Sequence, residues 1–257
     1  MKTTGNTILV TGGGSGIGAA LAQRWHDAGN SVIIAGRRQE ALDRAIAGRE
    51  RMHALTLDVT DSADIERFAA RVLAEHPALN VLVNNAGVMR IEPNDRRRDL
   101  GAAEETVAAN LLGPIRLTDA LIEHLSARGD AAIVTVTSGL AYVPLVDAAV
   151  YCATKAAIHS WTVSLRDALA GRVEVIELVP PGVQTDLTPG QAHRPGYMPL
   201  PAFIDEVMAL FAQTQTPPEI LVERVRPLRN AEREGRFDAT FQQLNTMARQ
   251  ARAAQGD

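Results

Sequence analysis

Cysteine and lysine are both scarce in this chain. The single cysteine among the 257 residues, Cys152, excludes an intrachain disulfide and a metal site built from several cysteines. The six histidines are scattered without the HExxH spacing of a zinc enzyme, so we expect no bound metal. Of the 26 basic residues only Lys2 and Lys155 are lysines, which leaves 24 arginines (26 minus 2). The chain therefore takes almost all of its positive charge from arginine.

Long apolar runs and a strong charge imbalance are also absent. The longest uncharged run, residues 131–146, is broken by Thr, Ser, Gly and Pro and is too short to cross a bilayer. The first residues are polar and do not resemble a secretory signal, so we expect a cytoplasmic protein. A net charge of −4 gives no indication of general nucleic-acid binding. Apolar residues make up 46% and charged residues 22%, the ordinary balance of a soluble globular protein.

Lys155 is the only lysine away from the start of the chain. It follows Tyr151 by four residues, and residues four apart share one face of a helix. A lysine ammonium is a compact point charge on a flexible stem, whereas an arginine guanidinium is a wide planar fork, so chemistry can require one and not the other. An ordinary surface lysine on a helix is the alternative. Its position beside one of only three tyrosines favours a catalytic pair.

Short β-branched segments alternate with longer helical segments along the chain. The candidate strands are almost entirely apolar, as expected for parallel strands buried on both faces. This alternation predicts an α/β fold with a doubly wound parallel sheet of about seven strands and helices on both faces. We predict strands at residues 7–10, 32–35, 53–57, 81–83, 132–137, 173–178 and 220–222, and helices at 17–28, 40–47, 63–75, 103–127, 151–170 and 204–211.

The chain shows no linker that would divide it, and no internal repeat. We therefore predict a single domain over residues 1–257. Residues 186–202 lie in a segment rich in Pro and Gly, and a loop of this length commonly closes over a binding site as a lid. Residues 230–257 are rich in Arg, Gln and Ala, and we expect a peripheral helix or arm.

A glycine-rich turn follows the first predicted strand and opens the first predicted helix. Its sequence is Thr11-Gly-Gly-Gly-Ser-Gly-Ile-Gly18. Glycines let the backbone approach a pyrophosphate, and the free N–H groups of a helix N-terminus favour its charge. A P-loop is excluded because no Gly-Lys-Ser/Thr follows, and Ile17 stands where the nucleophile elbow of hydrolases needs glycine. We predict a dinucleotide-binding turn formed by Gly12, Gly14, Ser15, Gly16, Ile17 and Gly18.

The end of the second predicted strand indicates which dinucleotide binds. An NAD-specific site places Asp or Glu there, on the ribose 2′-hydroxyl, but this chain has Gly36 followed by Arg37 and Arg38. Two cations at the start of a helix oppose its dipole, and a bound 2′-phosphate would explain them. Two exposed arginines without a ligand are the alternative. We expect NADP(H) in preference to NAD(H).

Five motifs occur together in the order and spacing of one family. They are the turn at residues 11–18, Asn84-Asn-Ala-Gly87 after the fourth predicted strand, Asn110, Ser138 and Tyr151-Cys-Ala-Thr-Lys155. Through them the chain resembles the short-chain dehydrogenase/reductase family in its form of about 250 residues. The resemblance covers residues 6 to about 223. The stretch Ile220-Leu-Val-Glu-Arg-Val-Arg-Pro-Leu-Arg is also similar to the bacterial DltE-like oxidoreductases.

The resemblance implies catalytic roles for four residues. Tyr151 would exchange a proton with the substrate oxygen, and the Lys155 charge would lower the pKa of that phenol. Lys155 would also bind the nicotinamide ribose, and Ser138 would hold the substrate oxygen. The ring of Pro114 displaces the Asn110 carbonyl from its helical bond, and in the family this carbonyl holds a water that links the lysine to solvent. Cys152 is better interpreted as a helix residue than as a nucleophile.

The resemblance also extends the cofactor site. The Asp58 side chain and the Val59 backbone would bind adenine. Further contacts come from the loops after the fourth and sixth predicted strands, the latter holding the nicotinamide carboxamide. The added cofactor residues are Asn85, Ala86, Gly87, Pro181, Gly182, Val183 and Thr185, together with Tyr151 and Lys155.

These assignments predict an oxidoreductase that transfers a hydride between NADP(H) and a ketone or aldehyde, reversibly with the secondary alcohol. An NAD-linked alcohol dehydrogenase of the same fold and a non-catalytic nucleotide-sensing protein are the alternatives. Candidate walls of the substrate pocket suggest an apolar or aromatic carbonyl compound, although plain packing explains each of them equally well. They are Val88, Met89, Leu140, Tyr142, Leu145, His193, Tyr197, Met198 and Phe203.

The end of the chain departs from the family pattern. Family members often end with a strand and a Gly-Gly pair that helps to build tetramers, whereas this chain continues as Glu223-Arg-Val-Arg-Pro-Leu-Arg. We therefore expect a homodimer formed through the predicted helices at residues 103–127 and 151–170, with a tetramer as the alternative.

Overall fold

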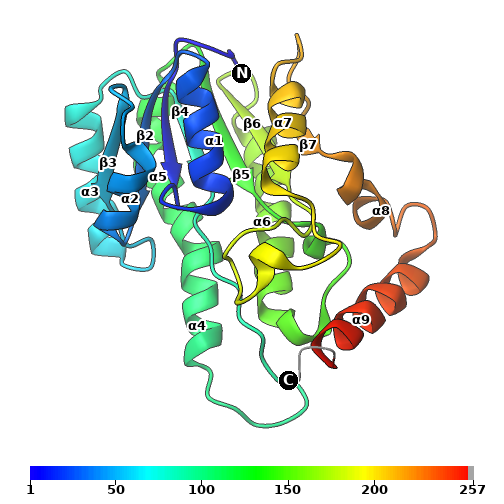
Figure 1. Ribbon diagram of the computed structural model, residues 1–257. Coiled ribbons are helices and arrows are strands. Elements are labelled where there is room, and N and C mark those ends of the chain that lie inside the picture. The colour runs from blue at the N-terminus through cyan, green and yellow to red at the C-terminus, as the bar shows by residue number, and fades with distance from the viewer. Residues whose placement is uncertain (254–257) are drawn as a thin grey trace.

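The computed structural model describes residues 1–253, so that residues 254–257 of the predicted C-terminal tail lie outside the described part of the chain. Seven parallel strands form one sheet with the order β3-β2-β1-β4-β5-β6-β7 (Figure 1). The chain winds outward from β1 in one direction and then, from β4, in the other. The predicted α/β fold with a doubly wound sheet is confirmed. The strands are β1 (Thr7–Thr11), β2 (Ser31–Gly36), β3 (Met52–Thr56), β4 (Val81–Asn84), β5 (Ala131–Val136), β6 (Val173–Val179) and β7 (Glu219–Leu221).

The two faces of the sheet carry two separate apolar cores. Along β1 the side chains of Ile8 and Val10 enter one core, while Leu9 between them enters the other. Successive side chains of a strand point to opposite faces, so a strand covered on both sides needs apolar residues throughout. This is why the sequence shows apolar runs without alternation.

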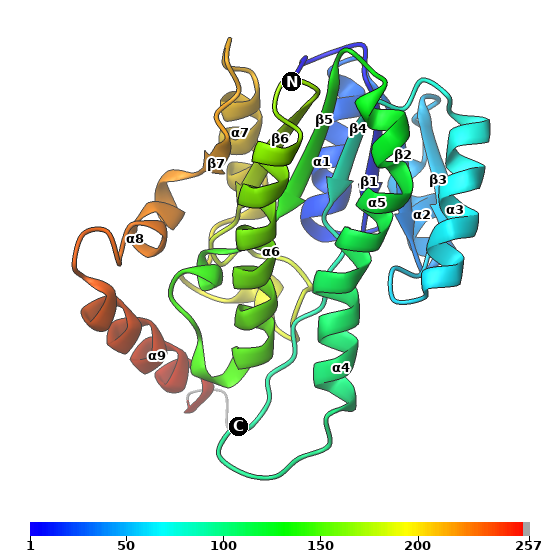
Figure 2. The ribbon, with the colours of Figure 1, turned by 180° about the vertical axis from the view of Figure 1, so that it is seen from behind.

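Three helices cover each face. Helices α1 (Gly16–Asp27), α2 (Gln39–Ile46) and α7 (Leu200–Phe211) pack on one face, and Trp25 of α1 meets Phe211 of α7 edge-on with 5.6 Å between ring centroids. Helices α3 (Ser62–Glu75), α5 (Gly113–Ser126) and α6 (Ala149–Ala168) lie on the other face, as Figure 2 shows.

The helix predicted over residues 103–127 contains a wider turn. Helix α4 (Gly101–Val107) passes through a π-helical segment, Ala108–Leu112, into α5. Pro114 has no N–H to donate to the carbonyl of Asn110, and the Gly113 N–H bonds instead to the Ala108 carbonyl, five residues back. The expected distortion at Asn110 therefore takes the form of a π-turn.

The C-terminal helices lie beyond β7. They are α8 (Arg226–Arg229) and α9 (Phe237–Ala253). The buried Asn245 of α9 accepts a hydrogen bond from the Val146 N–H at 2.8 Å and donates to the Pro144 carbonyl at 3.1 Å. These bonds dock α9 against the segment that leads into α6. None of the described helices combines the length and the apolar character needed to cross a membrane.

Candidate active site

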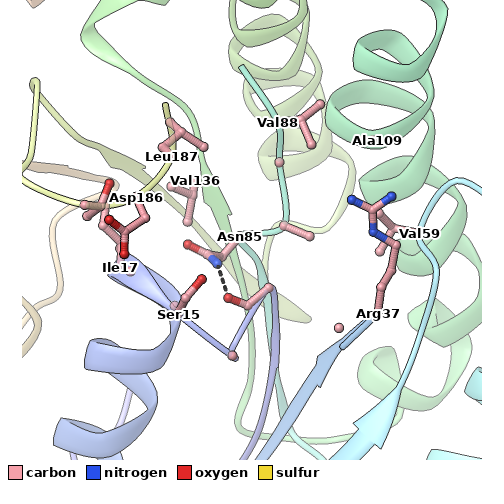
Figure 3. A pocket seen from close by; sticks show the side chains of 18 of the residues that line it. Ser15, Ile17, Arg37, Val59, Asn85, Val88, Ala109, Val136, Asp186 and Leu187 are labelled. Carbon is pink, nitrogen blue, oxygen red and sulfur yellow. Dashed lines mark hydrogen bonds between the residues drawn. The ribbon is translucent and has the colours of Figure 1, made fainter. Parts of the chain in front are cut away.

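A cleft of about 720 Å³ opens at the carboxyl ends of the central strands. Its walls are the segments that follow β1 to β6, at the edge where doubly wound sheets bind their ligands. Of the residues that the sequence assigns to the cofactor, Gly182 alone does not line this cleft. Figure 3 shows Arg37 beside Val59 at one end, and Ile17, Asp186 and Leu187 toward the other.

The glycine-rich turn forms the floor of the cleft, and its glycines are required by space. A Cβ on Gly13 would lie 2.5 Å from the Cβ of Ile34, and a Cβ on Gly18 would lie 2.5 Å from the Gly12 carbonyl oxygen. Gly12 and Gly16 have φ values of +66° and +55°, which favour glycine. The backbone of the turn can therefore lie this close to Ile34 of β2 and to Gly12 only because Gly13 and Gly18 have no side chains.

The start of α1 presents unpaired donors to the cleft. Ser15 is the N-cap residue, but its side chain makes no capping hydrogen bond, and the first turn contains no acidic residue. The first N–H groups of a helix lack intrahelical partners and favour an anion. A cradle without side chains, next to these donors, fits the pyrophosphate of a dinucleotide.

The loop after β4 is held against this turn by Thr11 and Asn85. The Thr11 hydroxyl accepts hydrogen bonds from the backbone N–H groups of Asn85 and Ala86, both at 3.0 Å. The Asn85 side chain donates to the Thr11 carbonyl at 2.8 Å. These bonds fix the two loops that border the middle of the cleft.

Charged residues gather at the Arg37 end. The exposed Arg37 places Nη1 3.7 Å from Oε1 of Glu105 in α4, and Oε2 of Glu105 pairs with Arg90 at 3.0 Å. Asp58 accepts hydrogen bonds from the N–H and the hydroxyl of Thr60. Burial would raise the pKa of Asp58, but these bonds and the Arg37 charge hold it below its ordinary value. The Arg37 guanidinium thus has a local partner, which sequence reasoning did not find.

Ser138, Tyr151 and Lys155 meet at the opposite end of the cleft. Ser138 follows β5 and caps a short 3₁₀ turn, Gly139–Ala141, by accepting the Leu140 N–H at 3.1 Å. Tyr151 stands in the first turn of α6 with 7% of its surface exposed. Lys155 lies one turn later and donates a 2.8 Å hydrogen bond to the Val136 carbonyl.

Burial dominates the pKa values of this pair. It raises the pKa of Tyr151 to about 12, although a hydrogen bond with Ser138 acts in the lowering direction. Burial also lowers the pKa of Lys155 to about 8. From the sequence we expect Lys155 to bring the phenol pKa down, whereas in the structure the loss of water around the phenolate outweighs every favourable contact. At neutral pH the phenol therefore keeps its proton.

Asn110 lies behind the cleft and does not line it. Its side-chain amide accepts the Val88 N–H and donates to the Val88 carbonyl, both at 2.8 Å, and donates to Thr154 at 3.3 Å. The Thr154 hydroxyl in turn donates to the Tyr151 carbonyl at 2.7 Å. Asn110 thus joins the loop after β4 to the helix that carries Tyr151.

Three predicted pocket residues lie in or against a cluster that contains Tyr151, although they do not line the cleft. Leu145 is buried in a small cluster with Tyr151 and Cys152, and Met89 and Leu140 pack against the cluster. Val88 lines the cleft itself. Burial raises the pKa of Cys152 to about 11, which keeps it a thiol and supports its interpretation as a packing residue.

Other predicted pocket residues are placed elsewhere. Phe203 is fully buried in the core between α7 and the sheet, and Met198 packs against that core. Tyr197 covers Gly182, where an added Cβ would lie 3.1 Å from its ring, and its phenol lies near enough to Tyr151 to act in raising the pKa of that residue. His193 is exposed on a 3₁₀ turn, and the Tyr142 hydroxyl bonds to a buried glutamate. None of these five residues lines the cleft.

The segment predicted as a lid contributes residues that sequence reasoning missed. Asp186, Leu187 and Gln191 line the cleft. The Gln191 amide donates to the Val183 carbonyl at 2.8 Å and to the Thr185 hydroxyl at 3.1 Å. No spacing or motif marks a glutamine in a Pro/Gly-rich loop, so only the folded structure identifies it.

Comparisons with known proteins identify the family to which this fold belongs. The family model described as short chain dehydrogenase matches residues 6–195. The Bacillus subtilis protein named uncharacterized oxidoreductase DltE is 40% identical over 250 residues, which are 96% of this chain and 99% of the relative. A short-chain dehydrogenase structure from Streptomyces avermitilis superposes with a TM-score of 0.79 at 27% identity, covering 95% and 98% of the two chains. A short chain dehydrogenase from Burkholderia cenocepacia in complex with NADP gives 0.79 at 26% identity, covering 94% and 99%. This chain belongs to the short-chain dehydrogenase family.

Proposed function

We propose that this protein is an NADPH-dependent reductase of a ketone or aldehyde, and that the reaction is reversible with the secondary alcohol. The observation that carries the proposal is that one cleft joins the glycine-rich turn to Ser138, Tyr151 and Lys155. The cofactor, when bound, supplies or accepts the hydride. The protein binds it, orients the substrate and handles the proton.

The residues proposed to bind the cofactor lie along the glycine-rich turn and at the Arg37 end of the cleft. The turn at residues 12–18 and the start of α1 hold the pyrophosphate. Arg37 and Arg38 hold the 2′-phosphate, and the NADP complex of the Burkholderia relative supports this preference. An NAD-linked enzyme is the alternative, and the relative affinities for NADPH and NADH decide between the two.

At the end of the cleft that holds Ser138, Tyr151 and Lys155, one proton is transferred to the substrate oxygen. Ser138 donates a hydrogen bond to the substrate oxygen and keeps it near Tyr151. Because its pKa is about 12, the Tyr151 phenol is protonated at neutral pH and gives its proton to the carbonyl oxygen during reduction. The Lys155 ammonium stabilises the phenolate that forms. The role of Asn110 as a proton relay stays a prediction, because the hydrogen bonds of its side chain do not involve the carbonyl that would hold the water.

Tyr151→Phe tests the function directly. A panel of ketones and aldehydes is supplied with NADPH, and consumption of NADPH is followed by absorbance. Removal of a general acid should lower turnover by about a thousandfold while cofactor affinity, measured by fluorescence titration, stays the same. Thr135→Val is the control, because it removes a buried hydroxyl that pairs with Thr162 and does not line the cleft. Turnover close to wild type in Tyr151→Phe would refute the assignment.

A homodimer formed through α4, α5 and α6 belongs to the same proposal. Leu112 and Val163 lie in this part of the fold with 37% and 48% of their surfaces exposed. A subunit contact through these helices would remove both side chains from water, which favours association. Sedimentation equilibrium of the wild type and of a Leu112→Glu/Val163→Glu variant tests this association.

A further inference from the structure

The turn that carries Ser138 is tied at both ends to one buried carboxylate. Thr137, just before the serine, donates its hydroxyl to Oε1 of Glu177 at 2.7 Å. Tyr142, at the end of the 3₁₀ turn, donates its hydroxyl to the same oxygen at 3.0 Å. Glu177 lies in β6 and is fully buried.

A third contact joins this carboxylate to the helix of Tyr151 and Lys155. His159 of α6 places Nδ1 2.8 Å from Oε2 of Glu177 and 3.0 Å from the Tyr142 hydroxyl. It follows Lys155 by four residues and so lies on the same side of the helix. The Glu177 side chain therefore connects the turn that holds Ser138 to the helix that holds Tyr151 and Lys155.

The carboxylate is ionised and fully paired. Burial alone would raise the pKa of Glu177, but the hydrogen bonds from His159, Thr137 and Tyr142 bring it below its ordinary value. Its neighbours in β6 at positions 175, 176, 178 and 179 are all buried and apolar, so an apolar residue would suit this strand. Burying a charge is costly unless it is paired, and the donors Thr137, Tyr142 and His159 supply this pairing.

The hydrogen bonds around Glu177 favour a structural role for this carboxylate over a cation site. His159, Glu177 and Glu219 place ligand atoms within 4.8 Å of one another. However, both oxygens of Glu219 accept hydrogen bonds from Arg229, at 2.7 and 2.9 Å, and both oxygens of Glu177 already have hydrogen-bond partners. The Arg229 guanidinium also lies 4.6 Å from the centre of the Tyr142 ring. A cation would have to displace all of these donors.

We propose that Glu177 is a positioning residue, which acts through Thr137 and Tyr142 to hold Ser138 at the correct place relative to Tyr151. The inference rests on the proposed function for its kinetic test. It explains why Tyr142, expected in the substrate pocket, is turned toward β6. The hydroxyls of Thr137 and Tyr142 fix the turn, and His159 fixes the turn and the helix to a common anchor.

A double-mutant cycle tests this role. Thr137→Val/Tyr142→Phe removes both hydroxyls and should lower kcat for the carbonyl by about ten- to a hundredfold, because a displacement of about 1 Å can cost about a hundredfold. Because Thr137 also lines the cleft, cofactor affinity is measured for each variant, so that a loss of binding is separated from a loss of kcat. In a Ser138→Ala background the same pair should have almost no further effect, since the residue through which they act is gone. An equal loss in both backgrounds would show a merely structural role and overturn the proposal.

The chain offers a matched control and a conservative rescue. Thr135 lies in β5 beside Glu177 of β6, but its buried hydroxyl pairs with Thr162 at 2.8 Å. Thr135→Val therefore removes a comparable bond while every donor to the Glu177 carboxylate stays in place. Its kcat should stay at the wild-type value. Glu177→Gln keeps an acceptor for Thr137 and Tyr142 and should retain most of kcat, whereas Glu177→Leu should lose it. Equal kcat values for Glu177→Gln and Glu177→Leu would contradict the positioning role of Glu177.

Crystal structures give a readout that needs no turnover. In Thr137→Val/Tyr142→Phe the distance between Ser138 Oγ and Tyr151 Oη should change or become heterogeneous, and in Thr135→Val it should match the wild type. An unchanged distance in the double variant would overturn the inference. If the wild type reduces no carbonyl compound, the proposed function fails, and this structural comparison still decides the positioning role.

Discussion

The ammonium of Lys155 lies over the ring of Tyr151, 5.7 Å from its centroid, and donates a hydrogen bond to the Val136 carbonyl. The lysine thereby ties α6 to the end of β5 while its charge faces the phenol. Both side chains are almost completely buried, with 5% of Lys155 and 7% of Tyr151 exposed. Burial disfavours the charged form of each, so it moves their pKa values in opposite directions.

The lowered pKa of Lys155 predicts a rise of stability with pH. Its folded value of about 8 lies below the ordinary 10.5, so between these values the unfolded chain binds more protons and the free energy of unfolding increases with pH. The gain approaches about 3 kcal/mol over the whole interval. Urea unfolding of wild type and Lys155→Met from pH 7 to about 10 measures it. Tyr151 acts with the opposite sign above pH 10, because its folded pKa of about 12 is raised.

The only other lysine serves as the control for this measurement. Lys2 has a side chain that is 63% exposed, so Lys2→Met should keep the wild-type slope between pH 8 and 10. Lys155→Met should show a flatter curve. Parallel curves for the wild type and Lys155→Met would mean that the buried lysine does not titrate in this interval.

Arg37→Ala should weaken NADPH far more than NADH. A charge-assisted hydrogen bond to the 2′-phosphate contributes about 1.5–3 kcal/mol, so the Kd for NADPH should rise by about ten- to a hundredfold. The Kd for NADH, which lacks this phosphate, should change little. Fluorescence titration at fixed ionic strength measures both constants. Arg44→Ala is the control, because Arg44 lies in α2, the helix that follows Arg37 and Arg38, and is exposed and away from the cleft.

Glu105 refines this prediction. Its carboxylate approaches Arg37 and Arg90, and so competes with a bound phosphate for the same guanidinium groups. Glu105→Gln should therefore tighten NADPH and leave NADH unaffected. Equal weakening of both cofactors by Arg37→Ala would instead favour the NAD-linked alternative.

Local patterns in the sequence predicted the features that depend on neighbouring residues. Apolar runs located the seven strands, and the glycine-rich turn and the spacing of Tyr151 and Lys155 located the floor and one end of the cleft. A phenol and an amine four residues apart on one helix face the same direction wherever the helix packs. These features could be predicted without knowing which distant segments are in contact.

Features that depend on distant segments could not be predicted in this way. Phe203 and Tyr142 are both aromatic, and the sequence predicts both as walls of the substrate pocket. In the structure Phe203 enters the core, and the Tyr142 hydroxyl reaches Glu177 in β6. Glu105 meets Arg37 only because the fold brings α4 beside the end of β2. The balance of burial and charge at Tyr151 also requires the packed structure, because a sequence gives the charge beside a phenol but not the water removed from it.

Asn245 should anchor the C-terminal helix, which the sequence alone predicts to be peripheral. Asn245→Ala leaves the Val146 N–H and the Pro144 carbonyl without their partner and should lower the free energy of unfolding by about 1–3 kcal/mol. Because Ala248 of the same helix packs against the cluster that contains Tyr151, detachment of α9 should also expose that cluster. Limited proteolysis should therefore cut α9 faster in Asn245→Ala than in Gln243→Ala, an exposed position on the same helix. Equal cleavage rates in the two variants would show that Asn245 does not hold α9 in place.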